Sequence, residues 1–130
     1  MSVCGLWQGP RRLVAVILDE DGYQRRPITV PLSPTNTHYL LAYLAAIDIG
    51  MLILPERSHT LIAQALALPL PLRLVPDYLL DTIRTASGHI HRPPRNTALM
   101  LARWHTIPTL RPYLREFRPP PVPEKQLLLF

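Results

Sequence analysis

The chain has 130 residues and a formal net charge of +5, and 48% of its residues are hydrophobic. This length is enough for one domain with its own core, and the single cysteine, Cys4, excludes an internal disulfide framework and favours a reducing compartment. No apolar tract reaches the roughly 20 clean residues of a membrane span, and the start MSVCGLWQG lacks a secretory signal, so we expect a cytoplasmic protein with no membrane partner.

Hydrophobic periodicity and turn residues divide the chain into strands and helices. Short apolar runs rich in β-branched residues predict strands, and apolar residues at helical spacing behind a capping residue predict helices. The predicted elements are strands at 2–7, 13–18 and 23–30, a helix at 35–47, a strand at 51–54, a helix at 58–68, a strand at 72–75, and helices at 77–87, 96–104 and 109–117. This order predicts a mixed α/β sheet flanked by helices, as in ribonuclease H-like folds.

Local signals add detail to this prediction. Residues 19–22, DEDG, are typical of a hairpin turn, with Gly22 at the position that needs a positive φ. Pro27 removes a backbone donor, which predicts that its strand lies towards an edge of the sheet. Thr35 or Asn36 is the expected cap of the first helix.

Proline is unusually frequent: there are 16 residues, more than double the usual share of about 5%. Residues 118–125, RPPPVPEK, are expected to form an extended polyproline II segment that acts as a semi-rigid spacer. We therefore predict a ribonuclease H-like domain at 1–117, followed by an extended Pro-rich linker and a C-terminal peptide motif at 118–130.

The positive charge is concentrated in the C-terminal half. Residues 82–118 contain seven arginines and one acidic residue. Because the arginine fork suits phosphate oxygens, this region predicts a face for DNA. The alternative is an ordinary solvated basic surface. The residues predicted to contact nucleic acid are Arg84, Arg92, Arg95, Arg103 and Arg111.

Three stretches share a pattern with a known family. They are GLWQGPRRLVAVILDEDG at 5–22, ILPERSHTLIAQAL at 53–66 and RPPRNTALMLARW at 92–104. In this order they resemble the first strands, the fourth strand and a later helix of the DEDD-type insertion-sequence transposases, whose catalytic domain is similar to the RuvC Holliday-junction resolvase. The resemblance implies a ribonuclease H-like fold.

The resemblance also implies where catalytic carboxylates would lie. Carried over position by position, the four acid sites fall on Trp7, Glu56, Pro94 and Thr97, so only Glu56 is an acid. A nuclease of this type needs several converging carboxylates to bind two Mg²⁺ ions. We therefore predict no catalytic residues and no cofactor. The alternative is a divergent metal-dependent nuclease or transposase-like enzyme that uses Glu56 with other acids.

The histidines and the cysteine suggest two other chemistries. His89 and His91 form an H-x-H pair to which His105 could add a third metal ligand, but neighbouring arginines oppose a cation, so we expect solvated loop histidines and no metal site. Cys4 could in principle act as a nucleophile if a histidine lay beside it in the fold. Its position in an apolar first strand instead predicts a buried structural thiol.

The last five residues, QLLLF, are unusual for a chain end. They resemble the pentapeptide by which bacterial polymerases and repair proteins bind the replicative sliding clamp, with matches at Gln126, Leu127, Leu129 and Phe130 and a departure at Leu128. A short peptide binds through a few deeply buried anchors, and the leucine and phenylalanine side chains suit this role. The alternative is that the tail packs on its own domain or completes a homodimer.

Together these patterns predict a small non-catalytic adaptor. Its body would present arginines to DNA or to a protein partner, and its tail would bind the sliding clamp. This function would belong to replication, repair or the biology of a mobile element.

Overall fold

The structure is a computed structural model that describes residues 1–86 and 94–116. Six strands form one sheet in the order β3-β2-β1-β4-β5-β6. The strands are β1 (Val3–Gln8), β2 (Arg12–Leu18), β3 (Ile28–Pro31), β4 (Met51–Pro55), β5 (Leu72–Val75) and β6 (Arg115–Glu116). The helices are α1 (Pro34–Ala46), α2 (His59–Leu66), α3 (Asp77–Ala86) and α4 (Pro94–Arg103), followed by the 3-10 turns η2 (Trp104–Thr106) and η3 (Arg111–Tyr113).

The sheet is mixed, as predicted. Strand β1 pairs antiparallel with β2 and parallel with β4, and β4 pairs parallel with β5. The outer strands β3 and β6 pair antiparallel with β2 and β5. The carboxyl ends of β1, β4 and β5 therefore meet at one edge of the sheet, which is where ligands bind in open α/β sheets.

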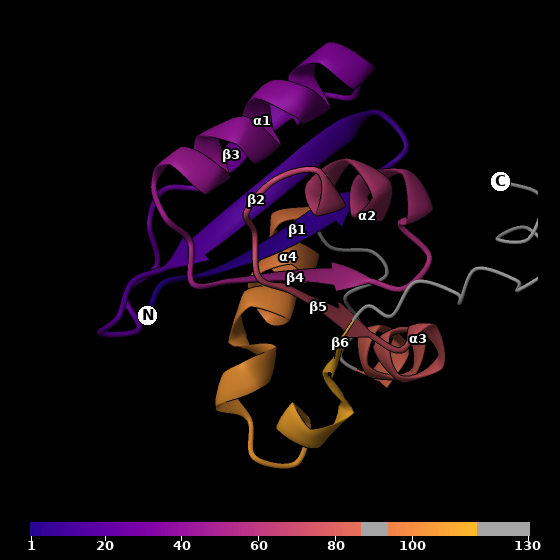
Figure 1. Cartoon of the computed structure of the whole chain (residues 1–130). Coiled ribbons are helices and arrows are strands. Elements are labelled where there is room, and N and C mark those ends of the chain that lie inside the picture. Colours follow the sequence, from indigo (N-terminus) through magenta and orange to yellow (C-terminus); the bar gives the residue numbers. More distant parts are fainter. Residues whose placement is uncertain (87–93, 117–130) are drawn as a thin grey trace, which may run out of the picture.

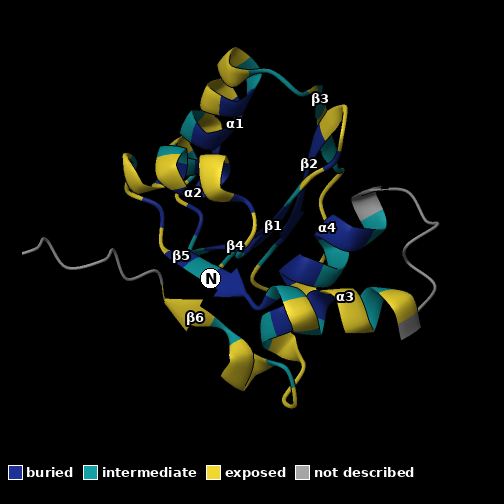
Figure 2. Ribbon diagram, turned by 90° about the vertical axis from the view of Figure 1, so that its right-hand side faces the viewer, coloured by how far each residue is buried: buried dark blue, intermediate teal, exposed yellow. Residues whose placement is uncertain are grey.

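Helices cover both faces of the sheet. Figure 1 shows α1 and α2 on one face and α3 and α4 on the other. Alternate residues along β1 divide between these faces, because Cys4 and Leu6 join the α1/α2 core while Val3 joins the α3/α4 core. The buried interior lies in these two layers, and the outer helix surfaces are exposed (Figure 2).

Close packing of α4 against β1 depends on Gly5. A Cβ at this position would lie 2.1 Å from the Ala98 carbonyl oxygen and 2.4 Å from the Ala102 nitrogen. Both atoms belong to the backbone of α4, so a side chain at position 5 would displace the helix. Glycine at position 5 therefore allows α4 to lie directly over the strand that carries Trp7.

Most predicted elements are confirmed with shifted boundaries. The third strand is shorter than the predicted 23–30: it is limited to Ile28–Pro31, with one isolated bridge from Leu18 to Gln24. Its edge position agrees with the Pro27 signal. The predicted cap of the first helix was wrong, because Ser33 accepts a hydrogen bond from the Asn36 nitrogen and Pro34 is the first helical residue.

The prediction for residues 109–117 was also wrong. A helix was expected, but the described residues form the short turn η3 and then β6, which pairs with β5 through Arg73 and Leu74. A two-residue strand has no periodicity of its own, so its pairing depends on the neighbouring strand. This sixth strand brings Arg115 to the carboxyl edge of the sheet. None of the described helices is long and apolar enough to cross a membrane.

Candidate functional site

The positions carried over from the transposase pattern lie on adjoining elements. Trp7 is near the end of β1, and Glu56 directly follows β4 at the same edge. Thr97 is 1% exposed on α4, which packs against β1, and Pro94 is the first residue of that helix. The acidic turn 19–21 follows β2 at the opposite edge, because Leu18 pairs with Val3 at the start of β1.

Trp7 fills the position where a first-strand carboxylate would lie. Its indole packs against two buried clusters on the α3/α4 face. The guanidinium carbon of Arg84 from α3 lies 4.5 Å from the centroid of the ring. Such a cation–π contact stabilises by about 0.5–2 kcal/mol, depending on desolvation. A cationic side chain and an aromatic ring therefore occupy this part of the edge.

Glu56 is already paired within the protein. Arg115 Nη1 from β6 donates to Glu56 Oε1 at 2.8 Å. The backbone nitrogen of Glu56 donates to the Val75 carbonyl oxygen at 3.0 Å, which fixes the residue between β4 and β5. Of the carried-over positions, Trp7 is aromatic and Thr97 is a buried hydroxyl residue, so Glu56 is the one carboxylate among them, and it is paired with Arg115.

Arg57 links the start of α2 to α3. Its Nε donates to Asp77 Oδ1 at 3.1 Å, and its Nη2 donates to Asp81 Oδ1 at 2.6 Å. Partial burial lowers the pKa of Arg57, but the hydrogen bonds and charges of Asp81 and Asp77 outweigh this and raise that pKa above its usual value. The side chain is therefore a fixed cation at the edge of the sheet.

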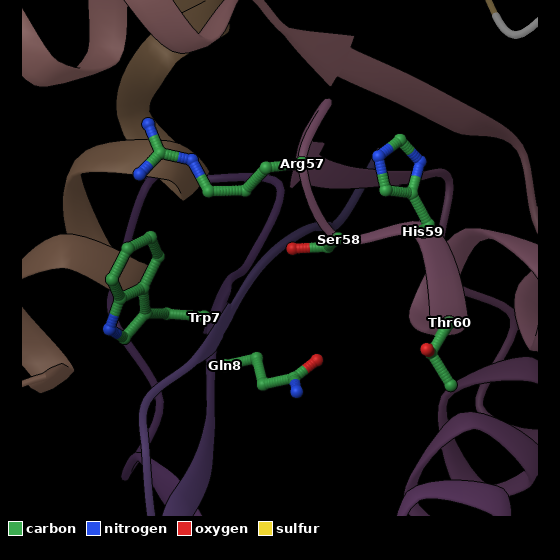
Figure 3. A pocket seen from close by; sticks show the side chains of 6 residues that line it. All are labelled: Trp7, Gln8, Arg57, Ser58, His59 and Thr60. Atoms are coloured by element: carbon green, nitrogen blue, oxygen red, sulfur yellow. The ribbon is translucent and has the colours of Figure 1, made fainter.

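A pocket of about 310 Å³ opens beside these residues. It is lined by Trp7, Gln8, Arg57, Ser58, His59 and Thr60. Figure 3 shows Trp7 and Gln8 from β1 on one side, His59 and Thr60 from α2 on the other, and the Ser58 hydroxyl pointing between them. A size near 300 Å³ is at the lower end of small-ligand sites.

The arginines predicted to contact nucleic acid are divided between different parts of the structure. Arg84 lies over Trp7. Arg103 is the last residue of α4, and Arg111 is the first residue of η3, where its Nε donates to the His105 carbonyl oxygen at 2.7 Å. Among the described residues, the side-chain salt bridges use other arginines, namely Arg25, Arg57, Arg73 and Arg115. Arg95 is in α4, where its side chain is not described, and Arg92 lies outside the described residues.

The structure also bears on the predictions for the cysteine and the histidines. Cys4 is fully buried, as predicted, and burial raises the pKa of its thiol to about 12. Within residues 1–86 and 94–116, no three His, Cys, Asp or Glu side chains gather as metal ligands. His89, His91 and the tail residues Gln126, Leu127, Leu129 and Phe130 lie outside the described residues.

Sequence reasoning missed the residues that surround this edge. Arg57 and Ser58 follow directly after the carried-over glutamate, and Asp77 and Asp81 have the i, i+4 spacing that places two side chains on one helix face. These signals were present in the sequence. Arg115 had no such signal, because its approach to Glu56 depends on the pairing of β6 with β5.

Comparison with known proteins supports the fold. No protein-family model and no curated protein matches the sequence. The structure is similar to T. thermophilus RuvC, solved in complex with a Holliday junction substrate, with a TM-score of 0.62 and 14% identity over 90% of this chain and 99% of that chain. At this identity the likeness concerns the fold alone. The chain therefore has a ribonuclease H-like fold of the RuvC type, as predicted.

Proposed function

We propose that this protein is a non-catalytic, DNA-associated adaptor that binds the replicative sliding clamp through its C-terminal QLLLF. Its biological setting would be replication, repair or a mobile element. The proposed units are a body at 1–117 and a linker with the binding motif at 118–130. The transposase resemblance, with its three ordered stretches, belongs to this proposal as the origin of the body.

The non-catalytic part of this proposal is supported by the side chains that lie at the carboxyl edge of the sheet. Arginine side chains lie where the family pattern implies bound metal ions: Arg84 lies over Trp7, and Arg115 is paired with Glu56. A metal pair would have to displace Arg84 and Arg115, and Arg57 already occupies the neighbouring carboxylates of Asp77 and Asp81. Arginines placed in this way favour direct contact with an anion.

Association with DNA is supported by charge and by the fold. The chain carries a net charge of +5, and Arg84, Arg103 and Arg111 have no carboxylate partner among the described residues. The RuvC structure with the similar fold was solved with a Holliday junction. Arginines that neutralise phosphates release counterions, so affinity for DNA should fall steeply as salt rises.

Clamp binding rests on the sequence of the tail. Gln126 can form oriented hydrogen bonds, and Leu129 and Phe130 are the apolar anchors of the motif that QLLLF resembles. A proline-rich spacer loses little conformational entropy when the peptide binds. The proposed DNA-contacting arginines and the tail would therefore join two partners through one small protein.

The clamp interaction is tested by titrating the full-length protein against a bacterial sliding clamp. We expect a dissociation constant on the order of micromolar, and we expect Phe130→Ala or Leu129→Ala to cost about 2 kcal/mol or more because anchors dominate such interfaces. Leu128→Ser is the matched control, since this position tolerates other residues in the motif. Equal binding by a protein truncated after residue 117 would overturn the role of the tail.

A further inference from the structure

The first turn of α2 has hydrogen-bond donors without partners. Ser58 is its N-cap residue but makes no side-chain cap hydrogen bond, whereas Ser33 caps α1 by accepting from Asn36. The Ile62 nitrogen donates to the Ser58 carbonyl oxygen, but the nitrogens of Thr60 and Leu61 have no hydrogen-bond partner among the described residues. A helix start of this kind attracts an anion.

The Ser58 side chain gives a second, independent sign of a ligand. Ser58 is only 8% exposed, and its Oγ has no described hydrogen-bond partner. Figure 3 shows this oxygen pointing into the pocket between Trp7 and Thr60. Because the rest of Ser58 is buried, its oxygen can take a hydrogen-bond partner only from what occupies this pocket.

The lining of the pocket favours an oxyanion. Donors come from the Ser58 hydroxyl, the Gln8 amide, the ring of His59 and the free backbone nitrogens of α2. The carboxylates of Asp77 and Asp81 bind the guanidinium of Arg57 and do not line the pocket. Arg57 therefore reaches the pocket wall as a cation held in place from α3.

We infer that this pocket binds a phosphate group directly, without a metal ion. Its volume of about 310 Å³ leaves room for an attached sugar or base. The phosphate would belong either to nucleic acid, in which case the inference deepens the proposed function, or to a small phosphorylated molecule. Both sources share the same recognition by Ser58 and the start of α2.

The direct test is an NMR titration of the full-length protein with inorganic phosphate in the presence of EDTA. We expect saturable shifts at the amides of Thr60 and Leu61. Ser58→Asp should weaken binding at least about tenfold, because its carboxylate would accept from the same nitrogens and repel the anion. The same change should raise the melting temperature, since Asp is a good N-cap, so lost binding would not reflect unfolding.

Ser33→Asp is the matched control. It makes the same substitution at the start of α1, where the serine already forms its cap bond, and Ser33 does not line the pocket. This variant should bind phosphate as the wild type does. Shifts that survive Ser58→Asp, or no saturable shift at Thr60 and Leu61, would overturn the inference.

A second arm with single-stranded and branched DNA in EDTA separates the two sources. Weaker DNA binding by Ser58→Asp assigns the phosphate to nucleic acid. Unchanged DNA binding, with inorganic phosphate still bound at α2, assigns it to a small molecule. If DNA is not bound at all while phosphate is, the phosphate site stands and the DNA part of the proposed function fails.

Discussion

The two faces of the sheet have different compositions. The α1/α2 face is covered by a continuous cluster of aliphatic side chains and Cys4. They come from alternate strand positions, from the inner sides of the helices and from two connecting segments, at Ile49 and Leu70. The α3/α4 face contains both tryptophans, the glycine beneath α4 and the arginine over Trp7. The pocket lies at the edge between the two faces, because it is lined by Trp7 and Gln8 of β1 and by residues 57–60 at the start of α2.

The positions carried over from the transposase pattern lie on the α3/α4 side of the sheet. Trp7 packs against both buried clusters of that side, and Thr97 is 1% exposed on α4. Under the proposed function, the loss of catalytic carboxylates would be confined to this side.

Removing a large buried side chain from either face should lower the free energy of unfolding more than any other change considered. Trp104→Ala should cost about 4 kcal/mol of unfolding free energy and Leu41→Ala about 3 kcal/mol, because both side chains are fully buried and leave cavities. Trp104 also donates from Nε1 to the Leu110 carbonyl oxygen at 2.9 Å, so its loss should loosen η2 and η3. Chemical denaturation measures both, and equal losses would remove the distinction between the faces.

Adding a single methyl group at Gly5 tests how closely α4 packs against β1. Gly5→Ala should cost about 3 kcal/mol, because its Cβ would overlap backbone atoms of Ala98 and Ala102. Gly22→Ala is the control: it has open space around it and a φ of 82°, so it should cost only about 1 kcal/mol. A loss below that of the control would show that α4 does not lie this close to β1.

The pH dependence of stability tests whether water is excluded from Cys4 in the α1/α2 core. Its pKa is raised from 9.0 to about 12 by burial, so the folded state keeps the thiol neutral while the unfolded chain ionises. The stability contributed by the neutral Cys4 thiol is complete below pH 9 and is lost as the pH rises towards about 12, by about 1.4 kcal/mol per pH unit. Cys4→Ala should make the free energy of unfolding less dependent on pH in this range. Identical pH profiles for the wild type and the variant would show that water reaches the thiol.

The ion pair at the edge should have the smallest effect on stability. Glu56→Gln should cost less than about 1 kcal/mol, because Arg115 is 52% exposed and such pairs are screened by water. Arg115→Gln should cost a similar amount, and the double variant should show little additional loss. A loss of several kcal/mol in either single variant would mean that Glu56 has a further buried partner.

The sequence predicted the fold class because the strands and helices of the body have clear periodicity. The runs in β2 and β4 and the apolar stripes of α1 and α2 were found close to their observed positions. Strand β6 was missed because two residues carry no pattern, and β3 was overestimated because only its last residues pair with β2. Strands of this kind are specified by their neighbours in the sheet.

The site was only partly predictable for a similar reason. The positions of Trp7 and Glu56 followed from the family resemblance, and their shared edge follows from parallel pairing of β1 and β4. The stacking of Arg84 on Trp7 and the pairing of Arg115 with Glu56 join residues far apart in the chain. Such contacts depend on tertiary packing and leave no local signal.

The most direct test of the central claim is one incubation series with a labelled four-way DNA junction. The full-length protein is mixed with the junction in EDTA, Mg²⁺ or Mn²⁺, and each sample is analysed on native and denaturing gels. We expect a shifted junction of similar affinity in all three conditions, with every strand intact, because the proposed contacts to phosphate use arginines and backbone nitrogens and need no metal ion. Metal-dependent nicking that disappears in Glu56→Gln would contradict the account and would identify the protein as a divergent nuclease.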